Sequence, residues 1–111
     1  MHRVEVERGD GTVVVSAVGE LDAYAAPDLA DAFVQVADED LLIVDLAAVS
    51  FLDSTALGVV VRGLREVEDR RGSARIVLPT GSARRIFEIT TLDRVLAVAP
   101  SRAEARAAFA D

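Results

Sequence analysis

The chain has 111 residues, of which 51% are hydrophobic, enough for the core of one domain of ordinary size. It contains no cysteine, which excludes disulfides and cysteine-based zinc or iron–sulfur sites, and its single histidine, His2, is at a terminus, which argues against histidine metal sites and Ser-His catalysis. The formal net charge of −7 disfavours nucleic acid as a partner. We expect one domain over residues 1–111 with no cofactor and no metal.

Membrane insertion and export are also not expected. No apolar run approaches the ~20 residues of a membrane-spanning helix. The first residues, MHRVEVERGDG, are charged and alternating, which is not the pattern of a signal peptide. The expected location is the cytoplasm.

The chain begins with a predicted β-hairpin. RVEVE, residues 3–7, alternates apolar and charged side chains as a half-exposed strand does. TVVVSAVG, residues 12–19, is β-branched and mostly apolar, which predicts a more buried strand. GDG at residues 9–11 is a tight-turn signal between them.

A helix is predicted over AAPDLADAFVQVADED, residues 25–40. Leu29, Phe33 and Val36 or Ala37 recur at helical spacing on one face. Pro27 suits the first helical turn, and the acids that follow it suit the positive end of the helix dipole.

LLIVDLAAV, residues 41–49, begins as an unbroken apolar run, which predicts a strand buried on both faces. A second helix should then run from Ser54 to about Arg70. Its inner stripe is predicted to be Leu57, Val60, Val61, Leu64 and Val67, and its outer side Thr55, Gly58, Val59, Arg62 and Glu66.

The last third should contain two short strands and two helices. We predict strands over ARIVLP, residues 74–79, and RVLAVA, residues 94–99, and a short helix over residues 82–89. SRAEARAAFA, residues 101–110, reads as a terminal helix with Ser101 and Glu104 as a capping box. The order β-β-α-β-α-β-α-β-α predicts an α/β fold with about four helices and a mixed, mainly parallel sheet that carries an antiparallel hairpin at its edge.

FLDSTALGVVV, residues 51–61, places an acid and two hydroxyls, Asp53, Ser54 and Thr55, between a strand and a helix. All three residue types are favoured helix caps, because their oxygens accept hydrogen bonds from first-turn amides. The position also suits a functional site, because functional groups gather where parallel strands end and helices begin. Both interpretations stay open on the local pattern alone.

Catalysis is the weaker hypothesis for this segment. The nucleophile motif GxSxG and the phosphate-loop motif GxxxxGK[ST] are both absent from the sequence. Asp22 and Asp53 could form a carboxylate pair at one edge of the sheet, but turn and cap roles are favoured for them.

Two motifs together are more specific. VGELDAYAAPDL, residues 18–29, followed by LLIVDLAAVSFLDSTALGVVVRGLREV, residues 41–67, resembles the STAS domain of anti-sigma factor antagonists. ARIVLPTGSARRIFEITTLDRVLAVAPSRAEA, residues 74–105, resembles the rest of that domain. The resemblance covers nearly the whole chain. Departures from the family pattern are Thr55 for a second Ser and Ala56 for a Gly.

This resemblance implies a small cytoplasmic bacterial switch and not an enzyme. Family members bind an anti-sigma factor that is also a serine kinase, which frees the sigma factor for RNA polymerase. The kinase phosphorylates the Ser that corresponds to Ser54, and a PP2C-like phosphatase resets the protein. The expected partner-binding residues are Asp22, Asp53, Ser54, Thr55, Gly58, Val59 and Arg62.

Two alternatives remain open from the sequence. The first is a STAS protein of another class, as a scaffold in a stress-sensing assembly or a subunit of a lipid transport complex. The second is a small-anion or nucleotide-binding module at the Ser54 helix terminus, which would require a basic residue nearby; none is adjacent in sequence.

Overall fold

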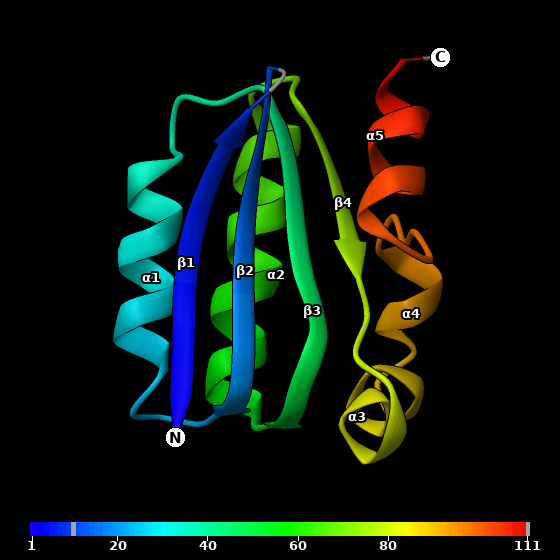
Figure 1. Ribbon diagram of the computed structural model, residues 1–111. Coiled ribbons are helices and arrows are strands. Elements are labelled where there is room, and N and C mark those ends of the chain that lie inside the picture. Colours follow the sequence, from blue (N-terminus) through cyan, green and yellow to red (C-terminus); the bar gives the residue numbers. More distant parts are fainter. Residues whose placement is uncertain (10, 111) are drawn as a thin grey trace.

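The computed structural model describes residues 1–9 and 11–110, and within them four strands form one mixed sheet in the order β1-β2-β3-β4 (Figure 1). The strands are β1 (His2–Gly9), β2 (Thr12–Leu21), β3 (Leu41–Leu52) and β4 (Ser73–Val77). β1 pairs antiparallel with β2, whereas β2 with β3 and β3 with β4 are parallel. The predicted edge hairpin and mainly parallel sheet are therefore confirmed; Asp10, within its predicted turn, lies outside the described residues.

Helices cover both faces of this sheet. The α-helices are α1 (Ala26–Gln35), α2 (Ser54–Asp69), α3 (Arg85–Ile89), α4 (Leu92–Val95) and α5 (Arg102–Phe109), and a 3-10 turn, η1 (Gly81–Arg84), leads into α3. α1 and α2 lie together behind the sheet in Figure 1, and α5 stands beside β4 on the right of that view. The described residues thus hold five α-helices, where the sequence predicted about four.

Alternation along the strands divides the core between the two faces. Val13 and Val15 of β2 belong to the large cluster under α1 and α2, whereas Val14 between them belongs to a small cluster under α5. Successive strand residues point to opposite faces, so one apolar run serves both layers. This is why β2 and β3 read in the sequence as unbroken apolar runs.

The first helix ends earlier than predicted. α1 stops at Gln35, and residues 36–38 form a turn, whereas the sequence pattern extended the helix to residue 40. Asp38, Glu39 and Asp40 would have formed its last turn, where negative charge opposes the helix dipole. Arg70 instead donates to the Val36 and Glu39 carbonyls at 3.3 and 2.7 Å, which holds the turn in place.

The prediction of a strand over residues 94–99 was wrong. Residues 92–95 form α4, and only Val98 pairs with Ile76, as an isolated parallel bridge. Two hydrogen bonds make this bridge, from Ile76 N–H to the Ala97 carbonyl and from Ala99 N–H to the Ile76 carbonyl, both 2.9 Å. α4 limits the pairing on one side, and Pro100, which has no amide hydrogen, limits it on the other.

α2 packs closely against α1 at a glycine that the sequence pattern did not place in the core. Gly63 is buried, and a Cβ atom added there would meet the Phe33 ring, 2.7 Å from its Cγ. Gly58, one turn earlier on the exposed side, has nothing within 4 Å of such a Cβ. Close approach of the two helices therefore depends on the absence of a side chain at Gly63.

These two glycines give a matched test of the packing. Gly63→Ala should lower the free energy of unfolding by about 1–3 kcal/mol, because the Phe33 ring must shift within the core. Gly58→Ala should raise it by up to about 1 kcal/mol, since Ala favours a helix. Urea denaturation of both variants measures these changes. Equal gains in stability would show that the two helices are not in close contact.

Candidate functional site

The ends of β2 and β3 bring together the two acidic motifs, GELD, which ends at Asp22, and FLDST, which contains Asp53. Leu21 pairs with Leu52 as the last residues of the two parallel strands. Asp22 and Asp53 follow directly, and Asp53 N–H donates to the Leu21 carbonyl at 3.0 Å. The two aspartates thus lie at the same edge of the sheet, as the carboxyl ends of neighbouring parallel strands require.

Asp53, and not Ser54, is the N-cap of α2. Its backbone is extended, and its Oδ1 accepts a hydrogen bond from Ala56 N–H at 2.9 Å. Its carbonyl accepts the first helical bond, from Leu57 N–H at 3.0 Å. Ser54 is therefore the first helical residue, with an exposed side chain that the cap does not require.

Asp22 performs a similar structural task before α1. Its Oδ1 accepts from Tyr24 N–H at 3.0 Å and from Ala25 N–H at 3.2 Å. Its carbonyl also accepts from Ala25 N–H and Ala26 N–H. Both aspartates thus hold the turns that start the helices, which supports the turn and cap interpretation over a catalytic carboxylate pair.

The outer side of α2 agrees with the sequence pattern except at one residue. Thr55, Gly58, Arg62 and Glu66 are exposed. Val59 was predicted to face outward, but it is half-buried and packs against the large core cluster. It lines a hollow of about 250 Å³ between α1 and α2, so a charge at this position would disturb the helix pair as well as any partner.

A longer groove runs along the other side of α2, towards α4. Its volume is about 550 Å³, and it begins at Ser54. The groove is lined by Ser54, Leu57, Gly58, Val61, Arg62, Arg65, Glu66, Asp69 and Leu92. Val61, predicted to lie in the inner stripe, is half-buried and forms part of this surface.

The groove that begins at Ser54 thus also contains two basic side chains, Arg62 and Arg65. Arg62 and Arg65 follow Ser54 by two and three helical turns, about 12 and 16 Å along the helix axis. This spacing exceeds what one small anion at the first turn of α2 can bridge. The groove suits an extended surface of a macromolecular partner better than a single bound anion.

Two exposed aromatic residues flank the same edge and were missed by the sequence analysis. Tyr24, two residues after Asp22, is 87% exposed, and Phe51, two residues before Asp53, is 49% exposed. Aromatic side chains anchor many protein interfaces, because they bury a large area with little loss of conformational entropy. Their closeness in sequence to Asp22 and Asp53 could have identified them as candidate partner-binding residues.

Within residues 1–9 and 11–110, no group of three or more His, Cys, Asp or Glu side chains is arranged to hold a metal ion. In the same part of the chain, no helix has both the length and the apolar character needed to cross a membrane.

A protein-family model described as the STAS domain matches residues 3–105, and the chain belongs to this family. The resemblance to this family is confirmed, and so is the α/β fold predicted from the order of strands and helices.

The relatives with similar sequences carry consistent names. The anti-sigma-B factor antagonist of Bacillus subtilis is 33% identical over 94 residues, which span 84% of this chain and 86% of that protein. A crystal structure of an anti-sigma factor antagonist from Mycobacterium paratuberculosis is 32% identical, with a TM-score of 0.88, and covers 100% of this chain and 96% of that one. These relatives are named as antagonists of other proteins and not as enzymes, as expected for this chain.

The phosphorylated form of the Bacillus cell fate determinant SpoIIAA shares the fold. Its TM-score is 0.73 at 24% identity, with 96% of this chain and 99% of that chain covered. Identity at this level supports the fold alone.

Because Asp53 caps α2 and Ser54 does not, removing each side chain should lower the free energy of unfolding by a different amount. Asp53→Ala should lower the free energy of unfolding by about 1 kcal/mol, because the Ala56 amide loses its acceptor. Ser54→Ala should change it by less than about 0.5 kcal/mol. Urea denaturation measures both, and Asp53→Asn, which can still cap, is the control. If Ser54→Ala lowered the free energy of unfolding as much as Asp53→Ala does, the assignment of Asp53 as the cap would be wrong.

Proposed function

We propose that this protein is a cytoplasmic antagonist of an anti-sigma factor that is also a serine kinase. The unphosphorylated form binds the anti-sigma factor and thereby frees the sigma factor. The kinase phosphorylates Ser54 and ends the binding, and a PP2C-like phosphatase restores the active form. The observation that carries the proposal is the exposed Ser54 hydroxyl, relieved of capping by Asp53, at the helix entry of a STAS domain.

The environment of Ser54 supports its choice over Thr55 as acceptor. Both side chains are exposed, but only Ser54 of the two lines the groove along α2. A kinase needs a hydroxyl that it can approach on a well-positioned backbone. The cap bond of Asp53 and the strand pairing before it supply that rigidity.

The proposed partner surface is the outer side of α2 together with the neighbouring turn at Asp22. Gly58 leaves space for close approach of a partner, since a Cβ there would meet nothing within 4 Å. Arg62 borders both the groove and the hollow between α1 and α2. Tyr24, in the turn that Asp22 holds, offers an exposed aromatic side chain.

Phosphorylation should act on the partner more than on the fold. Phosphoserine adds about −1.5 to −2 charges, which the first turn of a helix accommodates through its dipole and free amides. Asp53 and Asp22 oppose this gain by repulsion. A partner carboxylate about 8 Å away would be repelled by ~2 kcal/mol per unit charge at an effective dielectric constant of about 20. For a doubly charged phosphate this is about a thousandfold in affinity before salt screening.

Ser54 should be the residue that the cognate kinase phosphorylates. Treatment with the kinase and ATP should add one phosphate, measured by intact mass and located by phosphopeptide mapping. Ser54→Ala should abolish the modification while the protein remains folded, and Thr55→Val should leave it in place. Phosphate found mainly on Thr55 would contradict the assignment.

The phosphorylated protein should bind the anti-sigma factor at least a hundredfold more weakly than the unmodified protein, and Ser54→Asp should fall between them, because it carries one charge on a smaller group. Titration calorimetry measures the affinities. Backbone NMR shifts should change only near residues 20–24 and 52–62. Undiminished binding after phosphorylation, or shift changes throughout the sheet, would refute a local mechanism.

The position of Arg62 gives a test of the partner surface that does not depend on phosphorylation. Arg62→Glu should weaken binding to the anti-sigma factor at least tenfold and leave stability within about 0.5 kcal/mol, because the side chain is exposed. Arg106→Glu on α5 makes the same charge change on another exposed helical residue. Equal losses in both variants would indicate a general charge effect and not a contact at α2.

A further inference from the structure

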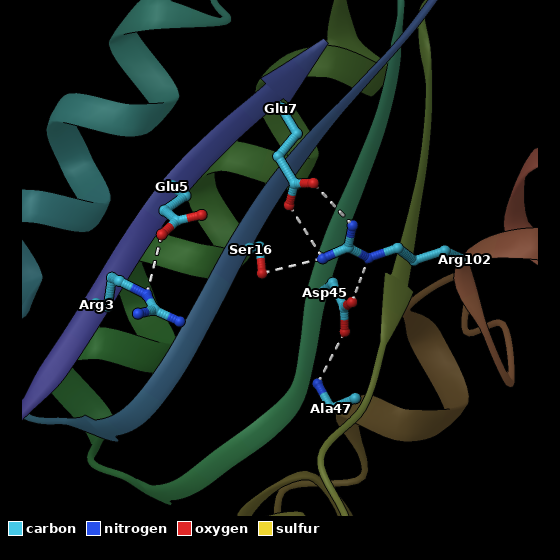
Figure 2. A network of polar contacts seen from close by, with 7 residues as sticks. All are labelled: Arg3, Glu5, Glu7, Ser16, Asp45, Ala47 and Arg102. Carbon is cyan, nitrogen blue, oxygen red and sulfur yellow. Dashed lines mark hydrogen bonds and ion pairs between the residues drawn. The ribbon is translucent and has the colours of Figure 1, made fainter. Parts of the chain in front are cut away.

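Arg102, the first residue of α5, joins that helix to three strands of the sheet (Figure 2). Its Nε donates to Asp45 Oδ2 of β3 at 2.5 Å. Nη1 donates to Glu7 Oε1 of β1 at 3.2 Å, and Nη2 lies 3.1 Å from Glu7 Oε2. Nη2 also donates to Ser16 Oγ of β2 at 3.1 Å. All three guanidinium nitrogens thus have acceptors, and β1, β2 and β3 each contribute at least one of them.

One of the acceptors, Asp45, is also held by a hydrogen bond from the backbone. Asp45 Oδ1 accepts from Ala47 N–H at 2.9 Å, where the pairing of β2 with β3 changes register. Its other oxygen is then directed at the guanidinium (Figure 2). The Asp45 side chain is only 15% exposed, so losing this partner would be more costly for it than for a carboxylate at the surface.

Apolar contacts hold α5 only weakly. The sheet offers Val14, Ile43 and Val77, but the helix itself contributes the buried Ala105 and the half-buried Phe109. A buried alanine removes little apolar area from water, and a helix of eight residues is not stable by itself. At the far end, the Arg75 guanidinium lies 5.5 Å from the centre of the Phe109 ring. Both ends of the helix therefore depend on an arginine.

We propose that α5 is a charge-latched cover over the second face of the sheet. With the Arg102 contacts closed, the helix shields Val14, Ile43 and Val77. Loss of those contacts releases α5 as a unit and exposes this apolar surface, while the strands, α1 and α2 remain folded. The proposal does not use Ser54, because α2 packs with the cluster on the other face of the sheet.

The chemistry of the latch favours control by ionic strength over control by deprotonation of the arginine. The hydrogen bond to Asp45, and then the one to Glu7, raise the pKa of Arg102 above its ordinary value. The guanidinium therefore keeps its charge at any physiological pH. Its side chain is 32% exposed and that of Glu7 is 47% exposed, so dissolved ions can screen their attraction.

Hydrogen exchange of the full chain, followed by mass spectrometry, tests the latch. Arg102→Gln should accelerate exchange in residues 105–109 at least tenfold and leave α2 and the centre of β3 unchanged. Arg102→Lys should also open α5, because the donors of an ammonium group share one nitrogen and cannot reach acceptors that are placed around three separate guanidinium nitrogens. Arg3→Gln is the matched control, since its pair with Glu5 lies on the same side of the sheet with side chains 69% and 54% exposed (Figure 2). Exchange in this control should match the parent protein.

Two results with the Arg102→Gln variant would overturn the proposal. One is exchange in α5 of Arg102→Gln that equals the parent, and the other is acceleration of α5, α2 and β3 together, which would make α5 part of the global fold. A salt series on the unmodified protein gives an answer even if that variant fails to fold. Raising NaCl from about 0.05 to about 0.5 M shortens the Debye length from roughly 14 to roughly 4 Å. This should accelerate exchange of residues 105–109 relative to α2, and an unchanged ratio would refute the latch.

Discussion

The hydrogen bond from Asp53 N–H to the Leu21 carbonyl closes the parallel pairing of β2 with β3, and the candidate site depends on it. It makes the two strands end together, so the turns that follow them start from the same edge of the sheet. Each turn begins with an aspartate whose carboxylate is used by the backbone, Asp22 towards α1 and Asp53 towards α2. Because these acids perform the capping, the next residue on α2, Ser54, carries a hydroxyl with no structural task.

The sheet also separates two surfaces that serve different purposes. On one face, α1 and α2 pack on the large apolar cluster and carry the proposed partner surface. On the other, α5 covers a small apolar cluster and is held by polar contacts at Arg102. Alternation of side chains in β2 and β3 allows both layers to share the same strands. A change in one layer therefore need not alter the other, provided that the strand pairing persists.

The sequence predicted those features that depend on neighbours along the chain. Alternation in residues 3–7, the apolar run from residue 41 and the helical stripe after Ser54 identified the strands and helix that frame the site, and Ser101 accepts the predicted capping bond from Glu104 N–H at 3.2 Å. Features set by distant residues could not be predicted in this way. Whether residues 94–99 form a strand depends on how far they can pair with β4, and α4 and Pro100 limit that pairing to a single bridge.

The same limit explains the interactions that were missed. The acceptors of Arg102 are 57, 86 and 95 residues away, so no local pattern indicates them. Burial of Gly63 and half-burial of Val59 follow from how closely α1 approaches α2, which the period of α2 alone does not determine. Local periodicity assigned the inner face of this helix correctly, but it could not resolve residues at the border between faces.

The net charge of the chain limits how the proposed switch at Ser54 can work. The chain already carries a formal charge of −7, and a phosphate would take it to about −9. Such a change alters the long-range field only modestly, and salt screens it beyond about 8–10 Å. Control of binding must therefore arise within about one Debye length, roughly 10 Å, of the phosphate, where partner charges are only partly screened. The rigid corner formed by Asp53 meets that requirement, because it holds the Ser54 hydroxyl at the end of the α2 groove and leaves it open to the proposed kinase.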